Sequence, residues 1–247
     1  MKPLFILLTA TLLHLSNCTD QQLRESQIAE GLYVELLHSI HLQQQDSAQL
    51  AEANLSVQLA KLRPLWQRPM SQRQKTIFHT HVGEAATAYA DIKPALSEKN
   101  YEAARIQLDR AVNELAAADP MAFERLHLGK AYDFYATWRE VHTIVDDQML
   151  CLMEWREYVW WANLANAEWA KIECIIPEQA IYQWTDEQLL TFEAASTNLG
   201  EKLALFTSNI YRGDQCDSQD LADLVETALW EYLDCFKAPT PTNELAG

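Results

Sequence analysis

Two acid–base side chains near the middle of the sequence could hold a ligand. Glu124 and His127 are three positions apart, which places them about one helical turn from each other. His142 falls on the same apolar arc if the helix continues that far. A carboxylate and two imidazoles on an apolar face need polar partners. We therefore take Glu124, His127 and His142 as candidate residues for a metal, haem or small-molecule site. A Glu–His hydrogen bond that only stabilises the core would produce the same pattern.

A basic segment interrupts an otherwise acidic chain, because no Asp or Glu occurs between Glu52 and Glu84. Such a segment could meet an acidic protein or anionic lipid headgroups, and its tryptophan would suit a membrane or protein interface. A solvated linker is the alternative. The candidate interface residues are Lys61, Arg63, Trp66, Arg68, Arg73 and Lys75.

Signatures of catalysis are missing from the sequence. It contains no Gly-rich phosphate loop, no Gly-x-Ser-x-Gly, no His-Glu-x-x-His and no Cys-x-x-Cys-His. We therefore predict a protein that is not an enzyme and needs no cofactor, with a metal or haem only in the ligand-binding alternative. The formal net charge of -16 weighs against nucleic acid as a partner.

The composition predicts an all-α fold. Only 6 Gly and 8 Pro occur in 247 residues, too few for the turns of a sheet-rich protein, and 49% of the residues are apolar. We expect an antiparallel helical bundle or a short stack of helix hairpins, with about eight helices. Ser71 is a suitable N-cap for the third helix, and Thr185 or Asp186 for the helix that starts near 186. The expected helices are 20–44, 47–62, 72–96, 101–118, one that opens at Asp119-Pro120 and breaks near Thr143 to Asp146, and then 146–173, 186–210 and 218–236.

The expected domain organisation is a signal peptide over 1–18, a single all-α domain over 19–236 and a disordered tail over 237–247. The domain could instead consist of two similar halves, 20–118 and 121–236. A shift of 117 residues aligns Val82-Gly83-Glu84 with Leu199-Gly200-Glu201, and it also places Glu114 on Glu231. Two unrelated amphipathic hairpins can match this well by chance.

The N-terminus has the pattern of an export signal. Lys2 precedes an apolar run from Leu4 to Leu15, which is too short to span a membrane, and the run is followed by Ser16-Asn17-Cys18. The last four residues, starting at Leu15, resemble the signal of bacterial lipoproteins, although Asn17 replaces the usual small residue. The resemblance implies a lipidated Cys18 that tethers the protein to a membrane. Ordinary cleavage after Cys18 would instead release it into the periplasm.

Four further cysteines fit an exported chain with two disulfides. Cys151 and Cys174 would lie at opposite ends of the helix 146–173, and Cys216 and Cys235 at opposite ends of the last helix, so neither pair can bridge. In an up-and-down bundle, we expect Cys151–Cys216 and Cys174–Cys235. Four free buried thiols are the alternative.

Residues 99–132 contain a repeat-like pattern. Lys99 to Ala104, with Ala111, resembles the second helix of a tetratricopeptide repeat, and Leu128 to Tyr132 resembles the first helix of one. The spacing exceeds the 34-residue repeat by about three residues. The resemblance implies stacked antiparallel helix pairs. Together these features predict an exported scaffold or interaction module with an envelope protein or membrane surface as partner; a periplasmic bundle that binds a small ligand, metal or haem is the alternative.

Overall fold

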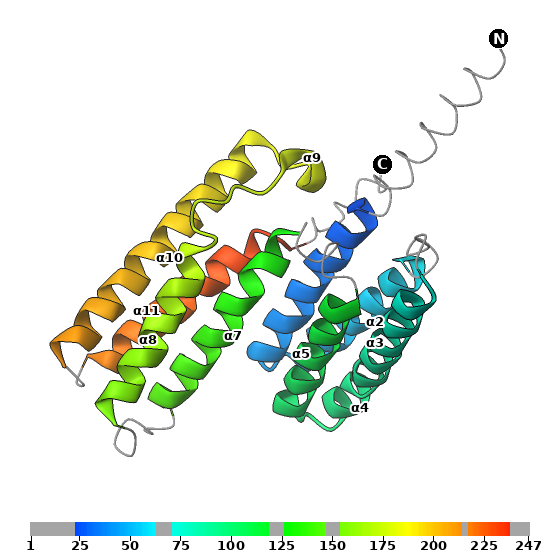
Figure 1. Cartoon of the computed structure of the whole chain (residues 1–247), viewed down its shortest axis with the longest axis horizontal. Coiled ribbons are helices and arrows are strands. Elements are labelled where there is room, and N and C mark those ends of the chain that lie inside the picture. Colours follow the sequence, from blue (N-terminus) through cyan, green and yellow to red (C-terminus); the bar gives the residue numbers. More distant parts are fainter. Residues whose placement is uncertain (1–22, 63–70, 119–125, 147–153, 214–216, 238–247) are drawn as a thin grey trace, which may run out of the picture. The chain divides into compact units, whose positions relative to one another are not determined.

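The protein is all-α, as the composition predicts. The computed structural model describes residues 23–62, 71–118, 126–146, 154–213 and 217–237, and the regular elements in these ranges are helices (Figure 1). Within this part of the chain, no helix combines the length and apolar character needed to cross a membrane. The signal segment with Cys18 and the tail after residue 237 lie outside the described residues.

The chain forms two compact units. Unit 1 extends to Phe123 and also includes Ala180–Tyr182 and the chain from Lys237, whereas unit 2 comprises Glu124–Gln179 and Gln183–Phe236. The boundary between the units follows residue 123, which lies just inside the predicted half 121–236. The two segments that resemble a tetratricopeptide repeat belong to different units.

Unit 1 contains a helix over 23–41, followed by α2 (Gln45–Leu62), α3 (Gln72–Ala90), α4 (Ile92–Ser97) and α5 (Tyr101–Ala118). Ser71 caps α3 as predicted, because its Oγ accepts a hydrogen bond from the backbone N of Gln74. The single helix expected over 72–96 is interrupted at Asp91. Pro94 would clash with the carbonyl of Ala90 in a continuous helix, whereas it is tolerated in the first turn of α4.

A later segment of the chain completes unit 1. The carboxylate of Glu30 is buried, and its Oε2 accepts a hydrogen bond of 2.6 Å from the hydroxyl of Tyr182 in the short helix α9 (Gln179–Tyr182). Lys237 Nζ lies 2.5 Å from Nδ1 of His38. Unit 1 therefore depends on residues far from its helices in sequence.

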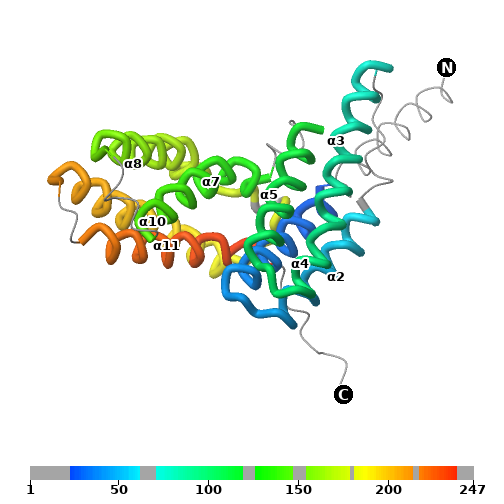
Figure 2. Tube along the Cα trace, turned by 90° about the horizontal axis from the view of Figure 1, so that it is seen from below, coloured from blue at the N-terminus to red at the C-terminus, as the bar shows by residue number. Residues whose placement is uncertain are grey.

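Unit 2 is an antiparallel four-helix bundle of α7 (His127–Asp146), α8 (Trp155–Ala170), α10 (Asp186–Arg212) and α11 (Ser218–Asp234). α7 packs beside α8 and α11, and α10 packs beside the same two helices, so the four form a closed ring. Figure 2 shows α7 and α8 above α10 and α11. Of the two predicted caps, Thr185 and Asp186, it is Thr185 that caps α10, and Gly213 ends the helix in the left-handed conformation, with φ of 73°.

The helix expected over 146–173 is wrong at both ends. α7 continues through Asp146, and α8 begins only after Glu154, whose extended backbone prevents a helical connection to the residues before it. α8 then ends in a turn at Lys171, where the buried Ile172 donates its N–H to the carbonyl of Trp169. Residues 147–153 lie outside the described residues.

Trp169 and Gly200 allow α8 and α10 to approach closely. A Cβ atom at Gly200 would lie 3.2 Å from Nε1 of Trp169. This distance is tighter than ordinary van der Waals contact, so a larger side chain would force the indole to move. Asn166 strengthens the same contact between helices, because its Nδ2 donates to Oγ1 of Thr207 at 2.6 Å.

The expected Cys174–Cys235 disulfide is not formed. Both cysteines are free thiols, Cys174 is exposed, and the thiol of Cys235 donates to the carbonyl of Glu231 at 3.4 Å. Trp169 near the end of α8 and Tyr232 near the end of α11 do meet, with ring centroids 5.5 Å apart, but Cys174 lies exposed beyond the end of α8 and is not directed at Cys235. Cys151 and Cys216 lie outside the described residues, so their pairing stays a prediction.

The same contact occurs in both units at positions related by the shift of 117. In unit 1, His81 on α3 lies 2.7 Å from the carboxylate of Glu114 on α5. In unit 2, Nδ2 of Asn198 on α10 donates to the carboxylate of Glu231 on α11 at 3.0 Å. Adding 117 to 81 and 114 gives 198 and 231. The hairpins α3–α5 and α10–α11 therefore share a contact as well as sequence matches.

Candidate metal centre on helices α7 and α11

Polar side chains connect α7 to α11 along the whole length of the two helices. His127 contacts Tyr232 where α7 begins and α11 ends, and Asp146 contacts Gln219 at the opposite end. These contacts show that the two helices are antiparallel. The intervening contacts join Trp138 to Glu226 and His142 to Asp223.

His127 is a core residue whose Nε2 is already engaged. The side chain is 2% exposed, and Nε2 lies 2.5 Å from the hydroxyl of Tyr232. The ring stacks on Phe236 with centroids 5.2 Å apart and meets Phe192 edge-on at 5.4 Å. Burial, and to a smaller extent the charge of Lys130, lowers the pKa of His127 from 6.5 to about 4. His127 is therefore neutral at physiological pH.

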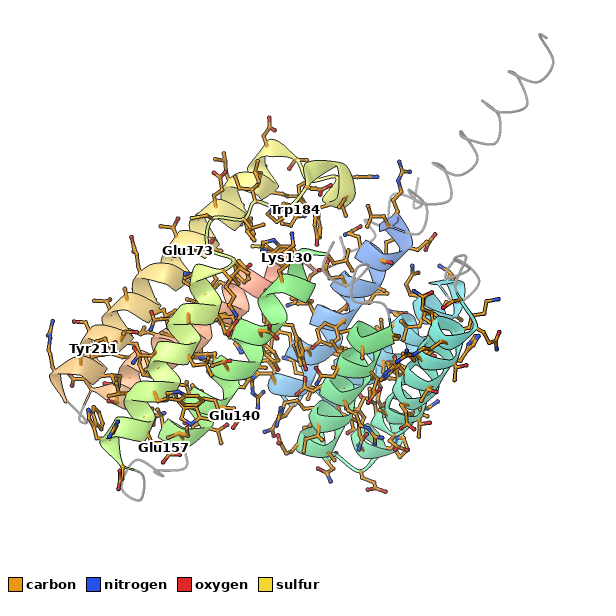
Figure 3. All side chains as sticks on the ribbon, viewed as in Figure 1. Lys130, Glu140, Glu157, Glu173, Trp184 and Tyr211 are labelled. Atoms are coloured by element: carbon orange, nitrogen blue, oxygen red, sulfur yellow. The ribbon has the colours of Figure 1, made fainter. Side chains whose placement is uncertain are left out.

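The aromatic cluster around His127 extends to Trp184, which lies 5.4 Å from both Phe192 and Phe236 between ring centroids. Figure 3 shows Trp184 and Lys130 at this end of unit 2. These rings fill the space around the imidazole. His127 is therefore a buried core residue, but its contact is with Tyr232, and the alternative of a hydrogen bond to Glu124 stays untested because Glu124 lies outside the described residues.

Glu226 occupies the middle of the contact between α7 and α11. Its side chain is 9% exposed, and its two carboxylate oxygens each accept a hydrogen bond from an indole. Trp138 Nε1 donates to one oxygen at 2.9 Å, and Trp230 Nε1 donates to the other at 2.8 Å. The carboxylate thus satisfies two buried indole donors. Glu226 was not among the sequence candidates, although it follows a buried position of an amphipathic helix.

His142, Asp146 and Asp223 form the group that could hold a metal ion. His142 Nε2 lies 3.2 Å from Oδ1 of Asp223, and Nδ1 lies 3.5 Å from Oδ2 of Asp146. One donor atom from each residue lies within 4.8 Å of the other two. The His142 side chain is 20% exposed, whereas Asp146 and Asp223 are 55% and 57% exposed. The group therefore lies at the surface of unit 2, where an ion can enter from solvent.

Gln219 joins this group from α11. Its Nε2 donates to Oδ1 of Asp146 at 2.8 Å and to Oδ1 of Asp223 at 3.3 Å. His142 and Asp146 are four residues apart on α7, and Gln219 and Asp223 are four residues apart on α11. A spacing of four places both members of a pair on one helix face. Two such pairs on adjacent antiparallel helices therefore face each other.

The chemistry of these groups suits a divalent transition metal. Zinc binds imidazole nitrogen and carboxylate oxygen at about 2.0–2.2 Å, which leaves donor atoms about 3–4 Å apart around the ion. The donor atoms here lie within 4.8 Å of one another. Rotamer changes of the two exposed aspartates can bring them to the shorter separation that a bound zinc ion requires. A cation would also relieve the repulsion between the two carboxylates.

Comparison of the chain with protein-family models, curated proteins and solved structures found no match. A functional assignment therefore depends on the side-chain arrangement of the chain itself.

The structure does not bring the sequence-predicted ligand residues together. His127 and His142 are fifteen residues apart on one straight helix, about 22 Å along its axis, and Glu124 lies outside the described residues. Only His142 belongs to the candidate metal centre. Asp146 was visible in the sequence through its spacing of four from His142, but Asp223 has no local signal, since its role depends on the packing of α11 against α7.

The predicted basic interface is described only in part. Arg63, Trp66 and Arg68 lie outside the described residues, whereas Lys61 ends α2, and Arg73 and Lys75 are exposed at the start of α3. Cations at a helix N-terminus oppose the helix dipole, and the first turn of α3 has no acidic residue to compensate. This end of α3 therefore carries an unusually positive local field.

Proposed function

We propose that this chain is a non-catalytic protein of the cell envelope that binds a divalent transition-metal ion through His142, Asp146 and Asp223. The observation that carries the proposal is the convergence of one imidazole and two carboxylates from two helices, with donor atoms within 4.8 Å. Since α7 and α11 are anchored to each other along their length, the backbone holds these three side chains close together before any ion arrives.

The donor set favours zinc and its neighbours over calcium or magnesium. Calcium and magnesium are bound almost entirely by oxygen, whereas an imidazole nitrogen favours Zn²⁺, Cu²⁺, Ni²⁺ and Co²⁺. The exposure of both aspartates favours reversible loading over catalysis, because metal catalysis usually requires a dry and shaped cavity. Buffering or delivery of the ion fits an exposed centre of this kind.

Replacing His142 tests this function. We expect the full chain to bind one Zn²⁺ per molecule, and we expect His142→Ala to weaken the affinity about 100-fold, since it removes the only nitrogen ligand. Isothermal titration calorimetry with Zn²⁺ at neutral pH measures both values. The matched control is His79→Ala, which removes an exposed imidazole from α3 in unit 1. Equal affinities of the His142 variant and the unaltered protein would disprove the site.

Interaction with an anionic surface is a second candidate function. The exposed Lys61, Arg73 and Lys75 support it, because Arg73 and Lys75 lie where cations are unfavourable for the helix itself. A favourable electrostatic interaction with an external anion would offset that cost. Together with the lipoprotein-like signal, this supports an exported scaffold that faces an envelope protein or a membrane, tethered through Cys18.

The anchor has a direct test. We expect protein extracted from its native membrane fraction to carry acyl chains on Cys18 in intact mass spectrometry, and Cys18→Ser to move it to the soluble envelope fraction. If Cys18→Ser stays on the membrane but Arg73→Glu with Lys75→Glu releases it, the basic surface mediates attachment. If the unaltered protein carries no acyl chain and is found in the soluble fraction, the proposed lipid tether is contradicted.

A further inference from the structure

Gln219 lies between the two carboxylates of the candidate metal centre. We propose that Gln219 determines which ions this centre accepts, because its amide nitrogen bridges the two carboxylates and its amide oxygen can serve as a further ligand when an ion binds. This inference rests on the proposed metal-binding function. It assigns a specificity-determining role to a residue that is neither His nor an acid.

The amide of Gln219 bridges the two carboxylates as a neutral hydrogen-bond donor. Nε2 donates to Asp146 at 2.8 Å and to Asp223 at 3.3 Å, so one NH₂ group bridges two negative charges. Ionised carboxylates can only accept hydrogen bonds, which is why the nitrogen side of the amide faces them. Without this bridge, only His142 and solvent would reduce the repulsion between the two carboxylates.

Metal binding requires the amide group of Gln219 to rotate so that its oxygen faces the ion. The amide nitrogen carries its lone pair in resonance with the carbonyl, and it therefore does not ligate a metal ion. A half-turn about the Cγ–Cδ bond exchanges Nε2 and Oε1, and a change of the side-chain rotamer then makes room for the ion between the oxygens. Oε1 then faces the position between Asp146 and Asp223. Together with His142, this gives four protein donors, the usual number for zinc.

The neutral charge of the amide sets the strength and selectivity of the centre. Two aspartates balance the charge of a divalent ion, so the loaded centre is neutral, and a third carboxylate would make it negative. Extra negative oxygen would tighten binding of every divalent ion, including Ca²⁺ and Mn²⁺, whose preference is for oxygen. With a glutamine at position 219, the nitrogen of His142 therefore supplies a larger share of the metal-binding free energy than it would beside a third carboxylate.

Two substitutions of Gln219 separate these roles. We expect Gln219→Glu to bind Zn²⁺ about tenfold more tightly and to raise the affinity for Mn²⁺ by a larger factor, which reduces discrimination between the two ions. We expect Gln219→Leu, which removes the amide oxygen at similar size, to bind Zn²⁺ about tenfold more weakly. Calorimetry on the full chain gives these affinities, and far-UV circular dichroism confirms that both variants are folded.

Cobalt reports the ligand number directly. Four protein ligands give Co²⁺ an intense tetrahedral visible band, which we expect in the unaltered protein and in Gln219→Glu, whereas Gln219→Leu should shift toward the weak band of water-rich, higher-coordinate Co²⁺. Unchanged or tighter Zn²⁺ binding by Gln219→Leu with an unchanged cobalt spectrum would overturn the role of Gln219 while leaving the metal centre intact. Failure of the unaltered protein to bind Zn²⁺ would instead overturn the proposed function itself.

Discussion

Replacing Glu226 by leucine is expected to lower the free energy of unfolding by about 3 kcal/mol, because two buried indole N–H groups lose their acceptor at once. Each unsatisfied donor costs about 1–3 kcal/mol, and the removal of a buried carboxylate offsets part of the sum. Urea unfolding followed by circular dichroism measures the difference. Glu226→Gln keeps one acceptor oxygen, so about half of the loss should remain.

Glu231→Leu is the matched control for Glu226, since Glu231 lies on the same helix but is exposed and bonded to Asn198. An exposed position of this kind should change stability by about 0.5 kcal/mol or less. If Glu226→Leu is as stable as the control, the carboxylate contributes nothing that a packed apolar side chain cannot replace, and the indoles find other partners.

Acid is expected to destabilise unit 2 through His127. The pKa of His127 is about 4 in the folded protein, against 6.5 for an exposed histidine, so between these values the unfolded chain binds the proton and the folded chain does not. The stability that neutral His127 provides is complete above pH 6.5 and is lost as the pH falls toward 4. The difference between the two pKa values corresponds to about 3 kcal/mol.

The double variant His127→Phe with Tyr232→Phe isolates this effect. It keeps ring packing at both positions and removes the imidazole together with the hydroxyl that contacts it. We expect unfolding free energies measured at several pH values to fall more steeply for the unaltered protein than for the variant between pH 6.5 and 4. Parallel curves would show that His127 is protonated equally in both states.

The sequence predicted the fold class and several helix boundaries because their signals are local. Ser71 and Thr185 mark the starts of α3 and α10, and α5 spans the predicted residues 101–118. The boundary between α7 and α8 was placed wrongly, because residues 121–176 contain no proline to mark it. Their single glycine, Gly129, lies near the start of α7 and far from the boundary. The disulfide between Cys174 and Cys235 failed because α8 ends at Ala170 and leaves Cys174 exposed beyond it, which helix periodicity does not encode.

The candidate site was predictable only on one helix. His142 was identified from its position on an apolar arc, and Asp146 follows one turn later. Asp223 and Gln219 contribute from α11, and the contacts that join them to α7 span 81 and 73 residues of sequence. Their approach depends on the antiparallel pairing of α7 with α11. Sequence patterns identify single faces of helices, whereas a site built from two helices requires knowledge of which helices are neighbours.

The hydrogen bond between Tyr182 and Glu30 has a consequence for the order of folding. Until Tyr182 is available, Glu30 would be buried without the hydroxyl that satisfies it, and His38 would lack Lys237. A chain released from its N-terminus therefore cannot complete unit 1 before most of unit 2 has followed. The helices of unit 1 thus reach their final packing only after the residues of unit 2 have been synthesised.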